Sequence, residues 1–100
     1  MKFSIQIAEY AKKDISEAYS WYILKNESIA DDFENQIYYA LKKIEDNPFK
    51  FQIRYKLIRV AFLKKFPFGI HYKINDNLIE IIAVFHTSQN PENWFNRNPL

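Results

Sequence analysis

The hydrophobic period of this chain changes twice, and this segregation restricts its fold more than any other feature. Phe3, Ile5 and Ile7 alternate with polar residues, as in a half-buried strand. A period near 3.6 residues follows up to residue 46, and a period of two returns from Tyr55 to Phe85. Because the helical and strand segments are grouped, the sequence predicts an α+β domain with one mostly antiparallel sheet.

The middle of the chain predicts two helices joined as a hairpin. The first spans about residues 8–25, and "KNES" separates it from the second. Ser28 with Asp31 matches a capping box at the second start, and Pro48 ends that helix before Asn47. The expected core stripes are Ala11, Ile15, Ala18 and Tyr22 in the first helix, and Ile29, Phe33, Ile37, Ala40, Leu41 and Ile44 in the second.

Three strands are expected after the hairpin, at residues 55–63, 66–74 and 78–85. "KK" and "NDN" supply the turns between them, and Asn and Asp tolerate left-handed turn geometry. The last strand is almost continuously apolar, which predicts a central place in the sheet. The whole chain, residues 1–100, is expected to form a single domain.

The composition excludes several kinds of chemistry. Cysteine is absent, which removes disulfides, thiolate nucleophiles and cysteine-based zinc sites. The single glycine, Gly69, excludes a glycine-rich phosphate loop, and two histidines do not predict a metal site. The net charge of +2 does not by itself indicate a nucleic-acid partner. We expect no cofactor, and no segment resembles a signal peptide or a membrane span, so we expect a cytoplasmic protein.

The last apolar stretch ends in the polar sequence "HTSQNP". His86 is a candidate general base, because histidine titrates near neutral pH. The alternative is that His86 fixes a turn at the strand end through a hydrogen bond. Thr87 and Ser88 follow His86 directly, but adjacent residues of an extended chain point apart, so neither is expected to be its nucleophile.

Two other groups of residues are candidate contacts with partners. Lys64 and Lys65 lie among aromatic residues, and this combination binds single-stranded nucleic acid in some proteins. The alternative is that the aromatic residues form the core and the lysines keep the edge soluble. Trp21, Tyr38 and Tyr39 lie off the core stripes and Trp94 lies in the polar tail; these four are candidates for binding a protein partner.

Four segments resemble a known protein family. They are "AKKDISEAYSWY", "IEDNPF", "RVAFLKKFPFGIHYKI" and "IIAVFHTSQNPENW", of which the "FP(F/Y)xIxY" strand and the "VxHxxxxPxxW" ending are the most specific. Together they resemble the RelE/ParE superfamily of bacterial toxins, also called plasmid stabilisation proteins. The resemblance implies the toxin of a type II toxin–antitoxin system, bound and neutralised by a cognate antitoxin as a hetero-oligomer. RelE-like members cut messenger RNA on the ribosome, and ParE-like members poison DNA gyrase.

The residues that such nucleases use are mostly missing. The resemblance places an arginine of the nucleases at Gly69 and another at Gln89, and basic residues of the preceding strand at Val60 and Phe62. Of that strand's basic residues, only Lys64 is retained nearby. Attack by an RNA 2′-hydroxyl builds negative charge on phosphorus, which arginine stabilises and glycine or glutamine does not.

Three hypotheses follow. The first is a toxin that acts by binding, with DNA gyrase as a candidate target, and it is not an enzyme. The second is a divergent ribosome-dependent endoribonuclease without the usual arginines, using Arg59, Lys64 and His86. A changed site for it could also be formed by Arg59, His71, His86 and Gln89. The third is an inactive module that only binds the antitoxin. His71, Lys64 and Lys65 are also candidates for contact with the target.

Overall fold

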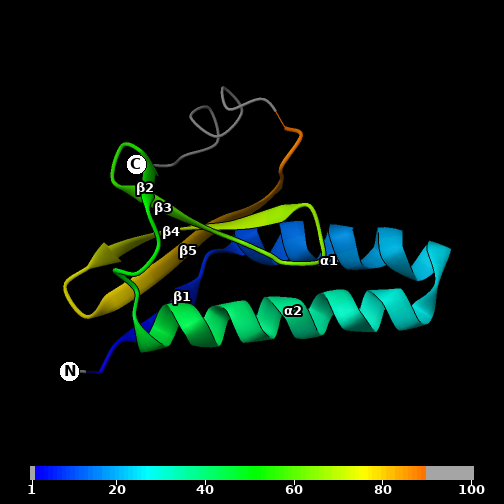
Figure 1. The fold of residues 1–100 in the computed structure, drawn as a ribbon, viewed down its shortest axis with the longest axis horizontal. Helices are drawn as coiled ribbons and strands as arrows, with labels where there is room; N and C mark the ends of the chain where they lie inside the picture. Colours follow the sequence, from blue (N-terminus) through cyan, green and yellow to red (C-terminus); the bar gives the residue numbers. More distant parts are fainter. Residues whose placement is uncertain (1, 90–100) are drawn as a thin grey trace.

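The computed structural model describes residues 2–89 and consists of one five-stranded sheet and two helices (Figure 1). The elements in chain order are β1 (Ser4–Ile7), α1 (Glu9–Lys25), α2 (Glu27–Asp46), β2 (Ile53–Tyr55), β3 (Ile58–Phe62), β4 (Phe68–Asn75) and β5 (Leu78–His86). The strand order is β1-β5-β4-β3-β2, in which only the β1–β5 pair is parallel. The predicted α+β class is confirmed. The last strand was expected to be central, and it lies inside the sheet between β1 and β4, whereas β4 is the central strand.

One strand was not predicted. Residues 55–63 were expected to form a single strand, but Lys56 adopts a left-handed backbone with φ 47° and turns the chain back. Ile53–Tyr55 therefore form the separate strand β2, paired with β3. The alternating pattern runs through the turn unbroken, and Leu57, which the turn leaves 77% exposed, looks like a strand residue in the sequence.

The start of α2 also differs from the prediction. Asn26, and not Ser28, is the N-cap: its side-chain Oδ1 accepts hydrogen bonds from the backbone N–H groups of Ser28 at 2.8 Å and Ile29 at 3.4 Å. Of the core stripe predicted for this helix, Phe33, Ile37 and Ile44 are buried, but Ile29 is 43% exposed and Ala30 is fully buried in its place. The end of α2 at Asp46, before Pro48, agrees with the prediction.

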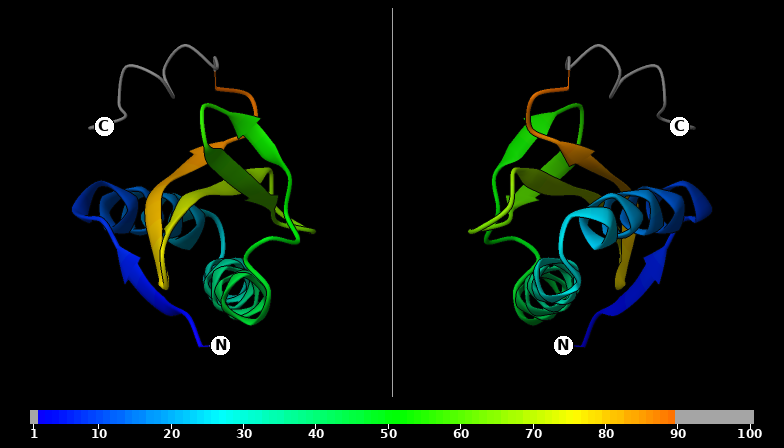
Figure 2. Two further views of the ribbon diagram at one scale, coloured as in Figure 1. Left: turned by 90° about the vertical axis from the view of Figure 1, so that its left-hand side faces the viewer. Right: turned by 90° about the vertical axis from the view of Figure 1, so that its right-hand side faces the viewer.

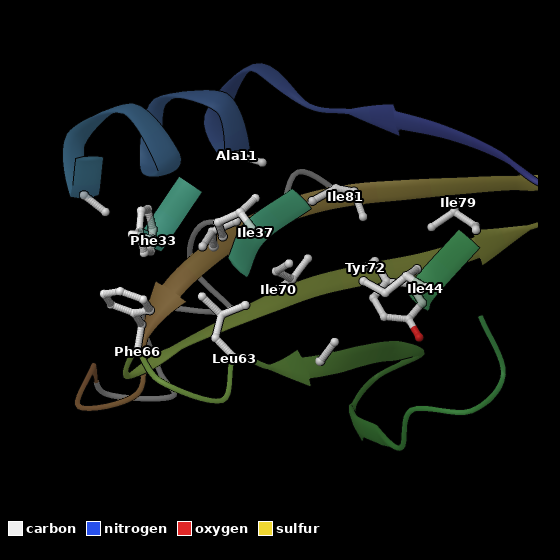
Figure 3. Packing of buried hydrophobic residues seen from close by; sticks show 13 residues of the cluster. Ala11, Phe33, Ile37, Ile44, Leu63, Phe66, Ile70, Tyr72, Ile79 and Ile81 are labelled. Atoms are coloured by element: carbon white, nitrogen blue, oxygen red, sulfur yellow. The ribbon is translucent and has the colours of Figure 1, made fainter. Parts of the chain in front are cut away.

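The helices pack side by side on one face of the sheet and enclose the main core (Figures 2 and 3). Phe33 of α2 is fully buried in this core, with its ring 5.4 Å from that of Phe66 and 5.2 Å from that of Tyr22. Such aromatic pairs stabilise the core beyond the area they bury. The core residues are Ala11, Ala18, Phe33, Ile37, Ile44, Ala61, Leu63, Phe66, Ile70, Tyr72, Ile79, Ile81 and Val84.

A β-bulge in β5 changes which residues face the helices. Tyr72 pairs with Ile81 and His71 pairs with Ala83, so Ile82 is an extra residue without a partner on β4. After the bulge Val84 faces the helices, whereas Phe85 joins a smaller cluster on the opposite face of the sheet. The bulge therefore sets the side-chain directions at the end of β5, where the candidate site begins.

Candidate functional site

His86 ends β5, and its imidazole is held within a turn. The backbone N–H of Ser88 donates to Nδ1 at 3.0 Å, and the Ser88 hydroxyl lies 2.7 Å from the same nitrogen. Gln89 completes the turn, because its Oε1 accepts a hydrogen bond from the His86 backbone N–H at 2.9 Å. Since Nδ1 accepts the Ser88 N–H, it is not free to act as a base. These hydrogen bonds agree with the alternative interpretation, in which His86 fixes a turn at the end of the strand.

A mostly apolar pocket of about 420 Å³ lies between α1 and the ends of β4 and β5. It brings together two residues that the sequence had assigned separate roles, Trp21 of α1 and His86 of β5. Trp21 is 56% exposed, and the His86 ring lies edge-on to Phe68 with centroids 5.1 Å apart. The lining residues are Ala18, Trp21, Tyr22, Pro67, Phe68 and His86. Among the described residues none of the lining side chains is a lysine or an arginine, although Lys25 Nζ lies 5.1 Å from the centre of the Trp21 ring. The lining itself suits an apolar group better than a phosphate.

Carboxylates lie next to this pocket, along α1. Asp14 of α1 accepts a hydrogen bond from the backbone N–H of Val84 at 2.9 Å. β1 ends at Ile7, opposite Ile81, so the later residues of β5 have no neighbouring strand on that side. The Asp14 carboxylate accepts the Val84 N–H that a strand would otherwise bind. Asp14, Glu17 and Gln89 line a second pocket, of about 380 Å³, with Lys13. Sequence reasoning missed Asp14, because helix spacing alone does not show which acidic residue reaches the sheet.

Arg59 is held far from His86. Its guanidinium donates to the backbone carbonyls of Phe51 at 2.7 Å and Phe49 at 3.3 Å, and lies 5.3 Å from the Phe49 ring. Arg59 pairs with Tyr72 and His86 with Phe68, four positions away on β4, or roughly 13 Å at the usual rise per residue. Arg59 therefore fastens the segment between α2 and β2, and the structure does not bring it together with His86.

His71 lies in the protein interior. It is 1% exposed, and its Nδ1 is hydrogen bonded to the Tyr55 hydroxyl at 2.9 Å. Burial lowers the pKa of His71 to about 4 and raises the pKa of Tyr55 to about 12, so both side chains are neutral at pH 7. The Phe85 ring packs edge-on against the imidazole with centroids 5.0 Å apart. The His71 side chain is therefore part of the buried packing of the sheet.

Gly69 pairs with Phe62 on β3 and has no room for a side chain. A Cβ placed on it would lie 2.7 Å from Val60 Cγ1 and 3.2 Å from Phe62 Cδ1. The ring of Phe62 is half exposed, and the Arg54 guanidinium lies 5.3 Å from its centre. Val60 and Phe62 thus fill the place where the resemblance puts a nuclease arginine.

The remaining candidates are distributed over the surface. Lys64 lines a groove beside Tyr39, and the Lys65 Nζ lies 3.8 Å from the Asp32 carboxylate, a solvent-exposed pair that contributes little to stability. Tyr38 and Tyr39 are both exposed on α2, with ring centroids 6.1 Å apart. Trp94 lies outside the described residues.

The part of the chain that the structure describes contains no group of three or more His, Cys, Asp or Glu side chains able to hold a metal ion. No helix within residues 2–89 is long and apolar enough to cross a membrane.

Comparison with known proteins places the chain in a family. The family model described as "ParE toxin of type II toxin-antitoxin system, parDE" matches residues 5–91. A solved structure titled "Chromosomal ParDE TA system from P. aeruginosa" has the same fold, with a TM-score of 0.77 over 87% of this chain and 98% of that chain, at 16% sequence identity. No curated protein matches the chain by sequence. Because the family model covers most of its length, the chain belongs to the ParE toxin family of type II toxin–antitoxin systems.

Proposed function

We propose that this chain inhibits bacterial growth by binding a cellular target, with DNA gyrase as the candidate, and that it does not cut messenger RNA. Membership of the ParE toxin family supports the role of toxin. The observation that carries the choice of mechanism is the crowding at Gly69. The Cβ of any larger residue at this position would lie 2.7 Å from Val60 Cγ1. The negative charge of the transition state requires a cation beside the phosphate. Position 69 provides neither a cationic side chain nor the space for one.

The other nuclease positions support the same choice. Gln89 is neutral and lies in a pocket with Asp14 and Glu17, whose carboxylates repel a phosphate. Arg59 donates to the backbone carbonyls of Phe49 and Phe51, and it lies opposite Tyr72, far along β4 from the strand end next to His86. His86 Nδ1 already accepts the N–H of Ser88. His86 and Gln89 share one turn, but Arg59 and position 69 bring no cation to that turn.

The pocket of Trp21 is the surface that we assign to the target. An exposed tryptophan beside an apolar pocket is typical of the few residues that contribute most of the affinity in protein–protein interfaces. His86 then serves as one wall of the pocket and is not a base.

We further propose that a cognate antitoxin binds the toxin as a hetero-oligomer in the cytoplasm. The structure of similar fold is titled as a ParDE toxin–antitoxin system, and that title concerns the other protein. Shared family and fold support the same kind of partner here.

The test is controlled induction of the protein alone in a bacterium, with pulse labelling of DNA and protein synthesis. Early loss of DNA synthesis, together with inhibition of supercoiling by purified gyrase, is the expected result. Loss of protein synthesis first, with cleaved messenger RNA, would overturn the proposal in favour of the endoribonuclease. Normal growth in the presence of soluble protein would also overturn it and leave the inactive antitoxin-binding module.

A further inference from the structure

Two pockets beside α1 are parts of one groove. The pocket of Trp21, of about 420 Å³, and the pocket that contains Glu17, of about 380 Å³, share Ala18 and Phe68 in their linings. Ala18 is buried and Phe68 is half-buried, so these two side chains form the floor where the pockets meet. The groove therefore passes along α1 from an apolar end at Trp21 to a polar end at Glu17 and Gln89.

One ridge of α1 borders this groove and carries opposite charges at its two ends. Glu17, Trp21 and Lys25 follow one another at intervals of four residues, so they lie on the same face of the helix. At the usual rise per residue, Lys25 lies roughly 12 Å from Glu17 along the helix axis. The Lys25 Nζ lies 5.1 Å from the centre of the Trp21 ring. The order along the ridge is therefore acidic, aromatic and basic.

The two end charges of the ridge are not neutralised by neighbouring side chains. Within residues 2–89 neither Glu17 nor Lys25 forms an ion pair. Lys13 and Asp14 also line the polar end, and together with Glu17 they carry one net negative charge. The groove is thus negative at one end, positive at the other and apolar between them.

This distribution of charge suits a polypeptide better than other ligands. A nucleic acid is negative along its whole length, so Asp14 and Glu17 repel it at the polar end. An aliphatic acid satisfies Lys25 and the apolar pocket but leaves Glu17 without a partner. In an extended polypeptide, side chains on one face recur about every 6.6 Å, at every second residue. Residues four positions apart are then about 13 Å apart, close to the separation of Glu17 and Lys25.

We propose that this groove binds an extended segment of the target protein in which an acidic, an apolar and a basic residue occupy every second position, in that order or its reverse. The acidic residue pairs with Lys25, the apolar residue fills the pocket beside Trp21, and the basic residue pairs with Glu17. The proposal rests on the proposed function, which assigns the Trp21 pocket to the target, and it adds the chemistry of the segment that the pocket recognises.

The test uses the full chain, isotope-labelled and made by cell-free synthesis, with short peptides as probes. The peptide acetyl-Asp-Ser-Leu-Ser-Lys-amide has the proposed order, and acetyl-Asp-Ser-Lys-Ser-Leu-amide has the same composition and charge in a different order. The NMR signal of the Trp21 indole N–H gives the dissociation constant. The chain has two tryptophans, so a Trp94→Phe variant identifies which indole signal belongs to Trp21.

Charge reversal on the protein tests the ionic contact at the Trp21 end. Lys25→Glu is probed with acetyl-Lys-Ser-Leu-Ser-Lys-amide, in which lysine replaces the aspartate that Lys25 would bind. Lys12→Glu is the matched control, because Lys12 is an exposed residue of α1 that lines neither pocket. Both variants change the net charge from +2 to 0.

We expect the wild type to bind the ordered peptide at least about threefold more tightly than the rearranged one, a modest ratio because exposed ion pairs are weak. Lys25→Glu should prefer the peptide with two lysines, and Lys12→Glu should keep the wild-type preference. Equal binding of the ordered and rearranged peptides would overturn the proposal, and so would an equal change of preference in both variants.

Other occupants of the groove give different results. Displacement of the Trp21 signal by octanoate but not by the peptide would assign the pocket to a small aliphatic acid and overturn the proposal. A Trp21 signal that moves with protein concentration alone would assign it to a second copy of the chain, with the same consequence. None of these measurements depends on toxicity. If the peptides fail while Trp21→Ala still abolishes growth inhibition, the proposed function stands and only the chemistry of the segment is wrong.

Discussion

His71 is a residue whose chemistry follows from where the fold places it. Burial lowers its pKa from 6.5 to about 4, so the folded protein holds the neutral imidazole while the unfolded chain gains a proton as pH falls below 6.5. Since the unfolded state binds more protons in this range, the free energy of unfolding should decrease as pH falls from about 6.5 to about 4. For His71 alone the loss is at most about 3 kcal/mol. Urea denaturation at pH 7, 5 and 4 measures it.

Carboxylates also titrate at the acid end of this range, so a matched comparison is required. A His71→Phe variant removes the titrating group, and its curve should be flatter between pH 6.5 and 5 than that of the wild type. Equal slopes for wild type and His71→Phe would refute the assignment.

Gly69 provides the second test at this scale. Gly69→Ala places a methyl group 2.7 Å from Val60 Cγ1, and a buried β-branched side chain yields little space. We expect a loss of about 1–3 kcal/mol in the free energy of unfolding, measured by chemical denaturation. The same change in a Val60→Ala background should cost less, because the clashing methyl group is gone. An equal cost in both backgrounds would mean that the crowding is not the cause.

The ends of elements were harder to predict than the elements themselves, and α2 shows why. Asn26 and Ser28 are both good N-cap residues by type, and only the geometry selects Asn26. We expect Asn26→Ala to lower the free energy of unfolding by about 1 kcal/mol, because two N–H groups lose their acceptor. Ser28→Ala, inside the helix, should change it by only a few tenths of a kcal/mol. Thermal or urea unfolding of both variants decides between the two caps.

The period of the sequence predicted both helices and the last two strands, because burial on one face sets that period, and the apolar run of β5 predicted a place inside the sheet. It did not predict β2, since Lys56 adopts a left-handed turn without the glycine or asparagine that usually signals one. The position of Arg59 depends on this turn and on the loop before β2, which contains Phe49 and Phe51. The sequence suggested Arg59 as a catalytic candidate, but its guanidinium donates to the backbone carbonyls of Phe49 and Phe51. Hydrogen bonds to backbone carbonyls cannot be predicted from residue types, because every residue has a carbonyl.

At the scale of the whole molecule, the sheet order places two surfaces apart from each other. The pocket of Trp21 lies between α1 and the ends of β4 and β5, and the groove beside Lys64 lies between α2 and the end of β3. One small domain thus carries an apolar pocket and a lysine-lined groove as separate surfaces.

Two residues of the Trp21 pocket separate a binding mechanism from a catalytic one. Binding requires the apolar contact but no proton transfer, so His86→Ala should keep growth inhibition within about twofold, whereas Trp21→Ala should weaken it at least tenfold, as loss of an interface tryptophan does. A nuclease predicts the reverse order. Tyr38→Ala is the matched control, because Tyr38 is 59% exposed, close to the 56% of Trp21, and lies outside the pocket.

Each variant is induced from the same promoter, and growth rate and DNA synthesis are followed at equal amounts of soluble protein. Trp21 is more than half exposed, so its loss should leave the melting temperature within a few degrees of the wild type, and a larger drop would remove that variant from the comparison. Full inhibition by Trp21→Ala would exclude the pocket as the contact with the target. Loss of inhibition by His86→Ala in a stably folded protein would return the imidazole to the chemistry, despite the Ser88 N–H that occupies its Nδ1.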